Sequence, residues 1–427
     1  MDRRVLLGWL TALAGCSARP TDSSSPERTT GSTPPTARTP FVTQETDVGL
    51  PNVRPDGNPV VTGQADLRGA TVVDVDLPAS PKAVAGLADV NGGSRWAALL
   101  GNGSVVGVRL DTNGAATFPL RPDRLDGPPL LLGDEDRVLV PGSLAPHTHP
   151  VPVAGGLTWV RSDGRLRTPG GIVAVDALPD AVPVTIGNRV FVLSEPTRAY
   201  THGVLGDEVE AGSVASVDAE AGRMQRRLVP PSGTVIEGRS AMLADLGGEP
   251  AIVVTASDAQ AGARLVAFGI DSEWQATGPP VGGGHRWRHQ LAVAPFGPGD
   301  EQTVAVVKTP HIGGVAEFYR RDGQTLRVAA SDAGGYQTHE IGSRTLGGAL
   351  AGRFAGDNRW LLVVPDRHRE NLLALDWREA GNGETVEQVF SLSLPGKLTS
   401  NLHGVAMNAE EVILAAGTDA GLRFFRG

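Results

Sequence analysis

Short runs of hydrophobic residues recur along the chain, and each is followed by a turn and then by a longer apolar run. The runs contain Leu87, Leu131, Val184, Leu243, Val293, Leu350 and Val405, mostly with Ala as the next residue. Successive openers are 44, 53, 59, 50, 57 and 55 residues apart. A drifting period of this size with strand-like patterning is typical of propellers that have one four-stranded sheet per repeat. The sequence therefore predicts an all-β fold, a seven-bladed β-propeller over residues 47–427.

One repeat illustrates the pattern. Residues 241–246 (AMLADL) form a short apolar strand, and residues 247–250 (GGEP) form a turn. Residues 251–255 (AIVVT) are continuously apolar, as expected for a strand buried on both faces between neighbouring blades. Residues 264–270 (RLVAFGI) supply the third strand, and a more polar fourth strand follows near Trp274. Small residues suit the first strand because inner strands converge on the propeller axis.

The last repeat is incomplete, since it contains three strand-like runs and no fourth. A candidate fourth strand precedes the first repeat at residues 71–77 (TVVDVDL), where β-branched residues alternate with acidic ones. We expect this segment to complete the last blade and close the ring, which removes the exposed strand edges that promote aggregation.

The N-terminus has the pattern of a bacterial export signal. Arg3 and Arg4 precede a short apolar run that ends in the sequence Leu-Ala-Gly-Cys at Cys16. This run is too short to span a bilayer, and the pattern resembles a lipoprotein signal peptide over residues 1–16. The resemblance implies lipidation of Cys16, which is the single cysteine of the chain. We therefore expect an extracytoplasmic protein, lipid-anchored to the cell membrane or the outer membrane.

Residues 17–46 are rich in Pro, Ser, Thr and charged residues and contain few large apolar ones. Such a composition cannot bury enough surface to fold, so we expect a disordered tether between the lipid and the propeller. The formal net charge of the chain is −9, which argues against a nucleic-acid partner because such partners require a basic surface.

The turns after several first strands contain Asp and Gly, as in residues 89–93 (DVNGG), 245–248 (DLGG) and 356–358 (GDN). These turns resemble those of the FG-GAP and VCBS repeats of integrin-like propellers, which often bind calcium. The resemblance covers most of residues 81–427 and implies the propeller fold. The alternating run of Asp residues of that family is absent, and one Asp or Asn per turn supplies too few oxygen ligands, so the turns do not predict calcium binding.

Candidate binding residues gather on one predicted face of the propeller. The loops before the first strands and the loops between the second and third strands share this face, and all nine histidines of the chain fall on these loops. The candidate ligand-binding residues are His202, Arg239, His285, Trp287, Arg288, His289, Lys308, His311, Tyr336, His339, Arg344, Arg367, His368 and His403. His147 and His149 lie in a long loop of the second repeat that is assigned to the same face.

This combination of residues leaves several functions open. Arg and Lys can bind carboxylates or phosphates, and Trp or Tyr can stack on a sugar. Histidines from several blades can bind a transition metal, and a histidine can act as a general base, as in a lyase or hydrolase. We expect a lipid-anchored envelope protein that binds a small anionic or carbohydrate ligand, or a protein partner, at this face. The alternative is an enzyme, with or without a metal, that uses the same histidines.

Overall fold

The computed structural model describes residues 48–51, 54–89, 92–132, 136–380 and 383–427. The expected signal peptide over residues 1–16, the lipidation site Cys16 and the expected tether over residues 17–46 lie outside the described residues. Within the described ranges no helix is long and apolar enough to cross a membrane.

The chain is built almost wholly of antiparallel strands that pair in consecutive groups of four. Unit 1 contains β4 (Pro81–Ala88), β5 (Ser94–Leu100), β6 (Ser104–Asp111) and β7 (Gly114–Arg124), and unit 2 contains β9 (Val151–Val153), β10 (Gly156–Val160), β11 (Arg165–Thr168) and β12 (Gly171–Ala174). Unit 3 contains β13 (Val184–Ile186), β14 (Arg189–Thr197), β15 (Glu210–Asp218) and β16 (Arg223–Leu228), and unit 4 contains β18 (Met242–Asp245), β19 (Pro250–Ser257), β20 (Arg264–Gly269) and β21 (Gln275–Thr277). Unit 5 contains β22 (Arg288–Ala294), β23 (Thr303–Lys308), β24 (Val315–Asp322) and β25 (Thr325–Ser331), and unit 6 contains β26 (Leu350–Arg353), β27 (Leu361–Pro365), β28 (Asn371–Ala380) and β29 (Gly383–Ser393). Unit 7 begins with β30 (Leu398–Ala406), β31 (Val412–Thr418) and β32 (Gly421–Arg426).

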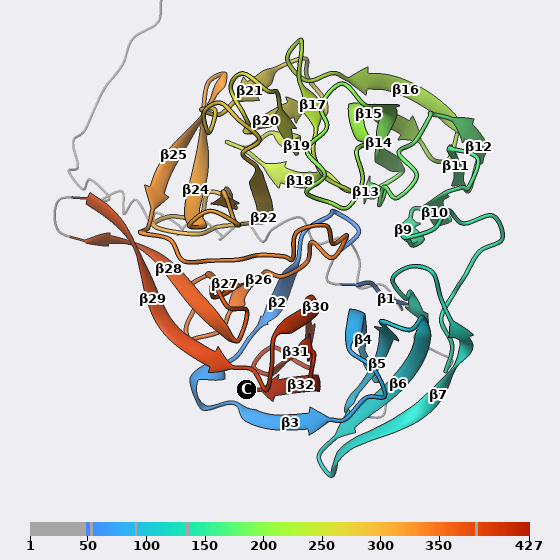
Figure 1. The fold of residues 1–427 in the computed structure, drawn as a ribbon, viewed down its shortest axis with the longest axis vertical. Helices are drawn as coiled ribbons and strands as arrows, with labels where there is room; N and C mark the ends of the chain where they lie inside the picture. The colour runs from blue at the N-terminus through green and yellow to red at the C-terminus, as the bar shows by residue number, and fades with distance from the viewer. Residues whose placement is uncertain (1–47, 52–53, 90–91, 133–135, 381–382) are drawn as a thin grey trace, which may run out of the picture. The chain divides into compact units, whose positions relative to one another are not determined.

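The units are arranged around a common middle, with their first strands inward and their last strands at the periphery (Figure 1). The second strands are apolar on both faces, as β19 shows with every residue from Ala251 to Ser257 buried. Apolar residues of adjacent units pack together, for example β18 to β20 of unit 4 with Val293 and Val304 of unit 5. Burial between sheets thus explains why the second strands lack alternation.

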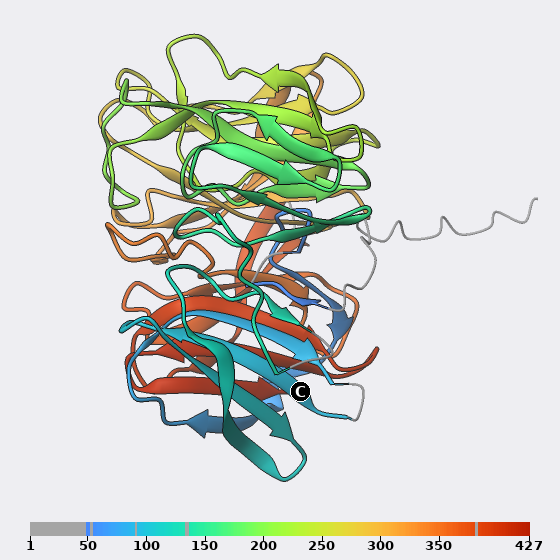
Figure 2. The same ribbon diagram turned by 90° about the vertical axis from the view of Figure 1, so that its right-hand side faces the viewer.

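Unit 7 obtains its fourth strand from the N-terminal part of the chain. β3 (Thr71–Val75) pairs antiparallel with β32 over its whole length, from Thr71 opposite Arg426 to Val75 opposite Leu422. The ion pair between Asp74 and Arg423 joins the same two strands at 2.6 Å. The pairing expected for residues 71–77 is therefore present. In the side view, unit 1 and unit 7 lie next to each other (Figure 2), and the Asn401 side chain joins them by hydrogen bonds to both backbone groups of Val84.

The opener expected at Leu131 was wrong. Leu131 and Leu132 form the short strand β8, which pairs with β1 (Val48–Gly49) and not with a strand of unit 2. The first strand of unit 2 is β9, which follows the loop that contains Pro141, Pro146 and Pro150. Proline cannot donate a ladder hydrogen bond. Within this loop Leu144 forms an isolated bridge with Arg161, whereas the continuous pairing of unit 2 starts at β9.

The N-terminal segment ahead of β3 was not assigned a place by the sequence pattern, and it lies against the inner strands of four units. The Asn58 side chain donates to the Leu243 carbonyl at 2.8 Å and accepts from the Val293 amide at 2.9 Å. Thr185 and Ala351 donate backbone hydrogen bonds to Pro55 and Pro59. β2 (Val60–Gln64) then pairs parallel with β26, and the 3₁₀ turn η1 (Leu67–Gly69) leads to β3. This segment therefore occupies the middle of the molecule.

Units 3 and 4 are joined by the additional strand β17 (Val235–Ile236), which pairs with β15 on one side and with β19 on the other. Because of this link, residues at the ends of β15 and β17 lie between the two units. The side chains described next come from this junction and from the loops of units 4, 5 and 6.

Candidate functional site

Five of the predicted histidines form two groups of contacting rings, His202 with His285 and His339 with His289 and His311, which are here together called the histidine cluster. The ring centroids of His311 and His339 are 4.7 Å apart, and those of His289 and His339 are 5.7 Å apart. His202 and His285 are stacked, with their ring centroids at 5.3 Å. Loops that are distant in the sequence thus bring these imidazoles together.

Trp287 and Tyr200 border the cluster at its two ends. The Trp287 ring stacks on His289 at 4.5 Å and meets His339 edge to face at 5.0 Å. Tyr200 contacts both His202 and His285 with centroid distances of 5.8 and 5.1 Å. His285 is exposed, whereas Trp287, His289 and His339 are buried. The cluster therefore extends from the surface into the interior.

Burial lowers the pKa of most histidines in this part of the molecule. Burial and then His202 and Arg369 lower the pKa of His311 to about 4. Burial and then His311 lower the pKa of His339 to about 4, while the hydrogen bond to the Val204 carbonyl acts in the opposite direction. The pKa of His289 is also well below its ordinary value, chiefly because the ring is buried. These three imidazoles are neutral at pH 7, so they add no positive charge to the site.

His202 is held by a buried carboxylate. Its Nδ1 lies 2.6 Å from Glu237 Oε1, and the Ser257 hydroxyl donates a hydrogen bond to the other oxygen of Glu237. Glu237 follows β17, and its backbone amide donates to Thr255 of β19 at 3.0 Å. Both oxygens of the carboxylate therefore have partners, and the ring orientation of His202 is fixed.

A second glutamate, Glu210, lies beside the His202–Glu237 pair. Ala211 of β15 pairs with Ile236 of β17, so Glu210 and Glu237 extend from opposite positions of the two strands, where side chains are close. Glu210 is buried, and its Oε2 has no hydrogen-bond partner among the described residues. Burial, and then repulsion from Glu237, Asp207 and Asp180, raise the pKa of Glu210 to about 9. Glu210 is therefore protonated at neutral pH.

A central cavity of about 220 Å³ lies next to the cluster. Residues of several units and of the N-terminal segment line it, including Pro59, Lys82, His149, Glu237, Arg239, Trp287, His289, Gln290, Arg344 and Asn401. Two polar atoms of these residues are buried without a partner among the described residues, namely Trp287 Nε1 and Gln290 Oε1. Two residues of the cavity lining thus carry a buried donor and a buried acceptor that have no partner among the described residues.

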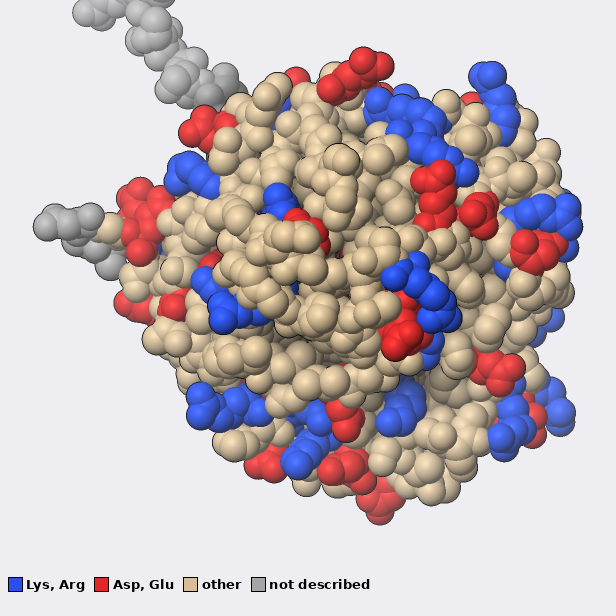
Figure 3. All heavy atoms as spheres, turned by 45° about the horizontal axis from the view of Figure 1, so that its top comes forward, with Lys and Arg blue, Asp and Glu red and all other residues tan. Residues whose placement is uncertain are grey.

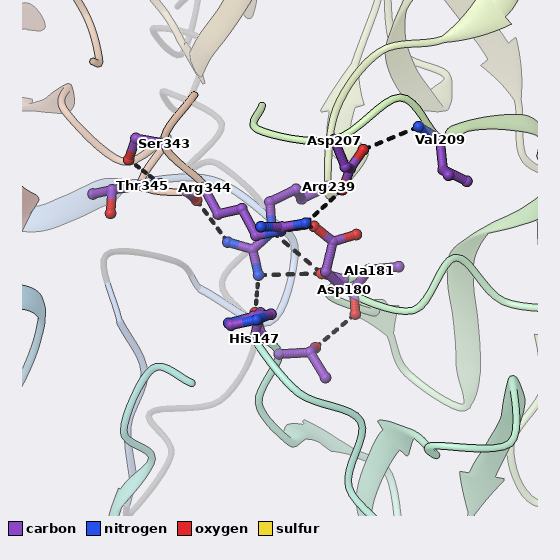
Figure 4. A network of polar contacts seen from close by, with 10 residues as sticks. His147, Asp180, Ala181, Asp207, Val209, Arg239, Ser343, Arg344 and Thr345 are labelled. Atoms are coloured by element: carbon purple, nitrogen blue, oxygen red, sulfur yellow. Dashed lines mark hydrogen bonds and ion pairs between the residues drawn. The ribbon is translucent and has the colours of Figure 1, made fainter. Parts of the chain in front are cut away.

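Arg239 and Arg344, both at the cavity wall, belong to a compensated network with Asp180 and Asp207 (Figure 4). Arg344 contacts Asp180 through Nε at 3.0 Å and Asp207 through Nη2 at 2.6 Å. Arg239 contacts Asp180 at 3.3 Å and donates to the backbone carbonyls of Arg344 and His147. Burial lowers the pKa of Arg239, and Asp180 counteracts this effect. Two cations face two carboxylates, so this network has no excess charge.

Several other predicted residues lie outside the cluster and the cavity. Arg288 and Lys308 both pair with the buried Glu317, Arg288 at 3.2 Å. Tyr336 donates to Asp332 and lines a separate hollow of about 340 Å³ together with His311, Ile341 and Arg367. His368 is exposed.

His403 lies at the junction of units 1 and 7. Its Nε2 is 3.1 Å from the Gly86 carbonyl, and its ring packs edge to face on Trp96. His149, in the loop before β9, contacts the Pro150 carbonyl through Nδ1 at 2.9 Å.

Sequence reasoning missed Tyr200, Glu210, Glu237 and Gln290 as site residues, together with Asp180 and Asp207. Tyr200 and Asp207 lie in the long loop between β14 and β15, and the length of this loop is a sequence signal for function that could have found them. The pairing of Glu210 with Glu237 depends on β17, a two-residue strand whose sequence carries no periodicity.

Among the residues that the structure describes, no group of three or more His, Cys, Asp or Glu side chains is placed to hold a metal ion. In the Asp-containing turns, Asp357 pairs with Arg359 at 2.6 Å and Asp89 with Arg95 at 3.4 Å. Basic and acidic residues are also interspersed on the face drawn in Figure 3.

Comparison with known proteins shows no membership of a family. No protein family matches the chain, including the FG-GAP and VCBS repeats, and no curated protein matches it. A mutant of the lectin from Aleuria aurantia in complex with Fucalpha1-6GlcNAc is similar in structure, with 12% identity, a TM-score of 0.34, and coverage of 83% of this chain and 93% of that chain. BBS1N in complex with ARL6DN is similar with 13% identity, a TM-score of 0.42, and coverage of 86% and 97%. The strand content of the described residues shows an all-β protein.

Proposed function

We propose that this chain is a seven-bladed β-propeller that binds a small, uncharged, hydroxyl-rich ligand of the carbohydrate type in its central cavity. The observation that carries this proposal is the pair of unpartnered atoms at the cavity wall, the Trp287 Nε1 donor and the Gln290 Oε1 acceptor. Buried polar groups are nearly always hydrogen-bonded in native proteins. A hydroxyl can accept from the first atom and donate to the second.

The charges at the cavity favour a neutral ligand over an anionic one. The buried arginines already face Asp180 and Asp207, and an anion would have to displace these carboxylates. His289 is neutral, and Glu237 adds a carboxylate to the wall. Liquid water occupies roughly 30 Å³ per molecule, so a cavity of about 220 Å³ suits a single sugar-sized group and excludes a polymer.

Calorimetric titration with neutral monosaccharides and disaccharides, and in parallel with sulfate and citrate, tests this function. We expect binding of at least one neutral sugar and none of the anions. Trp287→Phe and Gln290→Met should each weaken binding about tenfold, because one hydrogen bond in a buried site contributes about 1–1.5 kcal/mol. Arg367→Gln, at the separate hollow, should leave binding unchanged. Binding of anions alone, or equal binding by all variants, would contradict the proposal.

The cellular location of the protein and the closure of the propeller ring by β3 belong to the same proposal. The Leu-Ala-Gly-Cys pattern at Cys16 supports a lipid anchor, and the pairing of β3 with β32 supports a ring closed by the N-terminal strand. A Cys16→Ser variant expressed in a bacterium should move from the membrane fraction to the soluble extracytoplasmic fraction. Val73→Pro removes a ladder donor from β3 and should lower the melting temperature if this pairing closes the ring.

A second candidate function is that of a hydrolase or lyase, and one observation favours it. Glu210 has a raised pKa and lies beside Glu237, which orients His202. A titratable group with a strongly shifted pKa next to a second carboxyl group and a histidine is typical of acid–base catalysis. Activity towards chromogenic glycosides and esters that disappears in both Glu210→Gln and His202→Asn would replace the binding function with this one.

A further inference from the structure

His311 and His339 stand out among the described histidines because buried ring nitrogens of both residues have no partner. His311 lacks a partner at both Nδ1 and Nε2, and His339 lacks one at Nδ1. Their rings are neighbours at 4.7 Å. A buried polar atom without a partner lowers stability, so three of them in two neighbouring rings indicate a group that the side chains are arranged to bind.

The hydrogen bond of His339 determines which of its nitrogens can act as a ligand. Its Nε2 lies 3.2 Å from the Val204 carbonyl, which can only accept, so the proton is on Nε2 and the lone pair is on Nδ1. Metal-binding histidines almost always donate their second ring N–H to a carbonyl or carboxylate in this way. The nitrogen of His339 without a partner, Nδ1, is buried, and the His339 ring is the neighbour of the His311 ring.

Two further histidines of the cluster have the same arrangement. Nδ1 of His202 lies 2.6 Å from the Glu237 carboxylate, and Nδ1 of His289 lies 2.7 Å from the Thr338 hydroxyl. In both rings the hydrogen-bonded nitrogen is Nδ1, which leaves Nε2 for another partner. His289 contacts His339, and the charge of His202 acts on His311, so both are neighbours of the central pair.

We propose that His311 and His339 bind one transition-metal ion through imidazole nitrogen. Imidazole suits Cu²⁺, Ni²⁺ and Zn²⁺, with the highest affinity for Cu²⁺, whereas Mg²⁺ and Ca²⁺ prefer oxygen. The remaining coordination positions are filled by solvent, because no third His, Cys, Asp or Glu converges with this pair among the described residues. The metal reaches the pair through the hollow of about 340 Å³ that His311 lines. This proposal is independent of the ligand of the central cavity.

Titration of the untagged chain, after treatment with a chelator, tests the proposal with Cu²⁺ and Zn²⁺ as probes. We expect one equivalent of Cu²⁺ to bind, more tightly than Zn²⁺, and Mg²⁺ not to compete. The electron paramagnetic resonance spectrum of the Cu²⁺ form should show hyperfine coupling to at least two nitrogens. This spectrum requires no substitution, so it does not depend on whether a variant folds.

Substitutions then assign the nitrogens. His311→Gln and His339→Gln should each weaken Cu²⁺ binding at least tenfold, and the double variant should lose the nitrogen couplings. His368→Gln, an exposed histidine at the neighbouring loop, is the matched control and should bind as the unchanged chain does. The absence of stoichiometric binding, or binding and couplings that persist in the folded double variant, would overturn the proposal and leave water as the partner of these rings.

Discussion

His403 and His311 represent two ways of placing an imidazole in this fold. His403, between units 1 and 7, packs its ring on Trp96 and contacts the Gly86 carbonyl. Gly86 is required there, because a Cβ at this position would collide with the Trp96 ring. His311, in a loop of unit 5, has two buried ring nitrogens without partners. The first imidazole belongs to the packing of the core, whereas the second lowers stability and is available for binding.

The first prediction compares the free energy of unfolding of variants at His403 and at His311. His403→Ala removes the contact with Trp96 and leaves the Gly86 carbonyl without its side-chain donor, so unfolding should become easier by about 2–4 kcal/mol. His311→Leu removes two unpartnered polar atoms, so the metal-free chain should change by less than about 1 kcal/mol or become more stable. Urea unfolding of both variants measures the difference. Similar losses for the two variants would mean that the contrast is wrong.

The second prediction concerns the loss of stability at low pH, to which buried histidines near both His403 and His311 contribute. Burial lowers the pKa values of His149, His311, His339 and His403 to about 4, below the value of about 6.5 for an unfolded chain. The unfolded state then binds more protons between pH 6.5 and 4, so stability is present above pH 6.5 and is lost as the pH falls through 4. Melting temperatures between pH 7 and 4 should show this loss.

His403→Gln sharpens this measurement. The decrease in melting temperature with falling pH should become shallower, because this variant lacks one of the histidines whose pKa is lowered. An unchanged slope in a folded variant would show that His403 does not contribute to the acid sensitivity.

A smaller, opposite effect is expected from Glu210. Its pKa is raised to about 9, so the folded state retains a proton that the unfolded state loses above about pH 4.5. Its contribution to stability is complete below about pH 4.5 and decreases as the pH rises through 9, with a slope of at most about 1.4 kcal/mol per pH unit. Glu210→Gln should therefore stabilise the chain at pH 8 and have little effect at pH 5. The exposed Glu208→Gln is the control, and equal gains at both pH values would contradict the assignment.

The sequence predicted the repeating units well, because the second strands are buried on both faces and appear as continuous apolar runs such as residues 251–255. It also predicted the pairing of residues 71–77 with the last unit, from the three strands found after residue 398. The prediction from sequence failed at Leu131. Leu131 and Leu132 lie before a proline-containing loop, and they pair with Gly49 and Val48, which precede them in the chain. The N-terminal segment around Asn58 was missed because its hydrogen bonds reach residues as far as 235 positions away.

The sequence prediction placed the histidines on one face and assigned no role to the acids. In the structure, ring contacts join His202 to His285, and join both His289 and His311 to His339. Sequence position could not separate these residues from His403, since the difference lies in the ring contacts. Glu210 and Glu237 were missed because their juxtaposition depends on β17, whose two residues have no distinguishing pattern.

The pairing of β3 with β32 has a consequence for the order of folding. Asp74 and Arg423 are 349 residues apart in the chain, so closing this contact involves nearly the whole folded body, and contacts between such distant residues form slowly. During synthesis, β3 leaves the ribosome early, and its partner β32 emerges only when residues 421–426 have been made. A chain that stops before residue 421 therefore has no strand to offer to β3, and unit 7 can assemble only in chains that include β32.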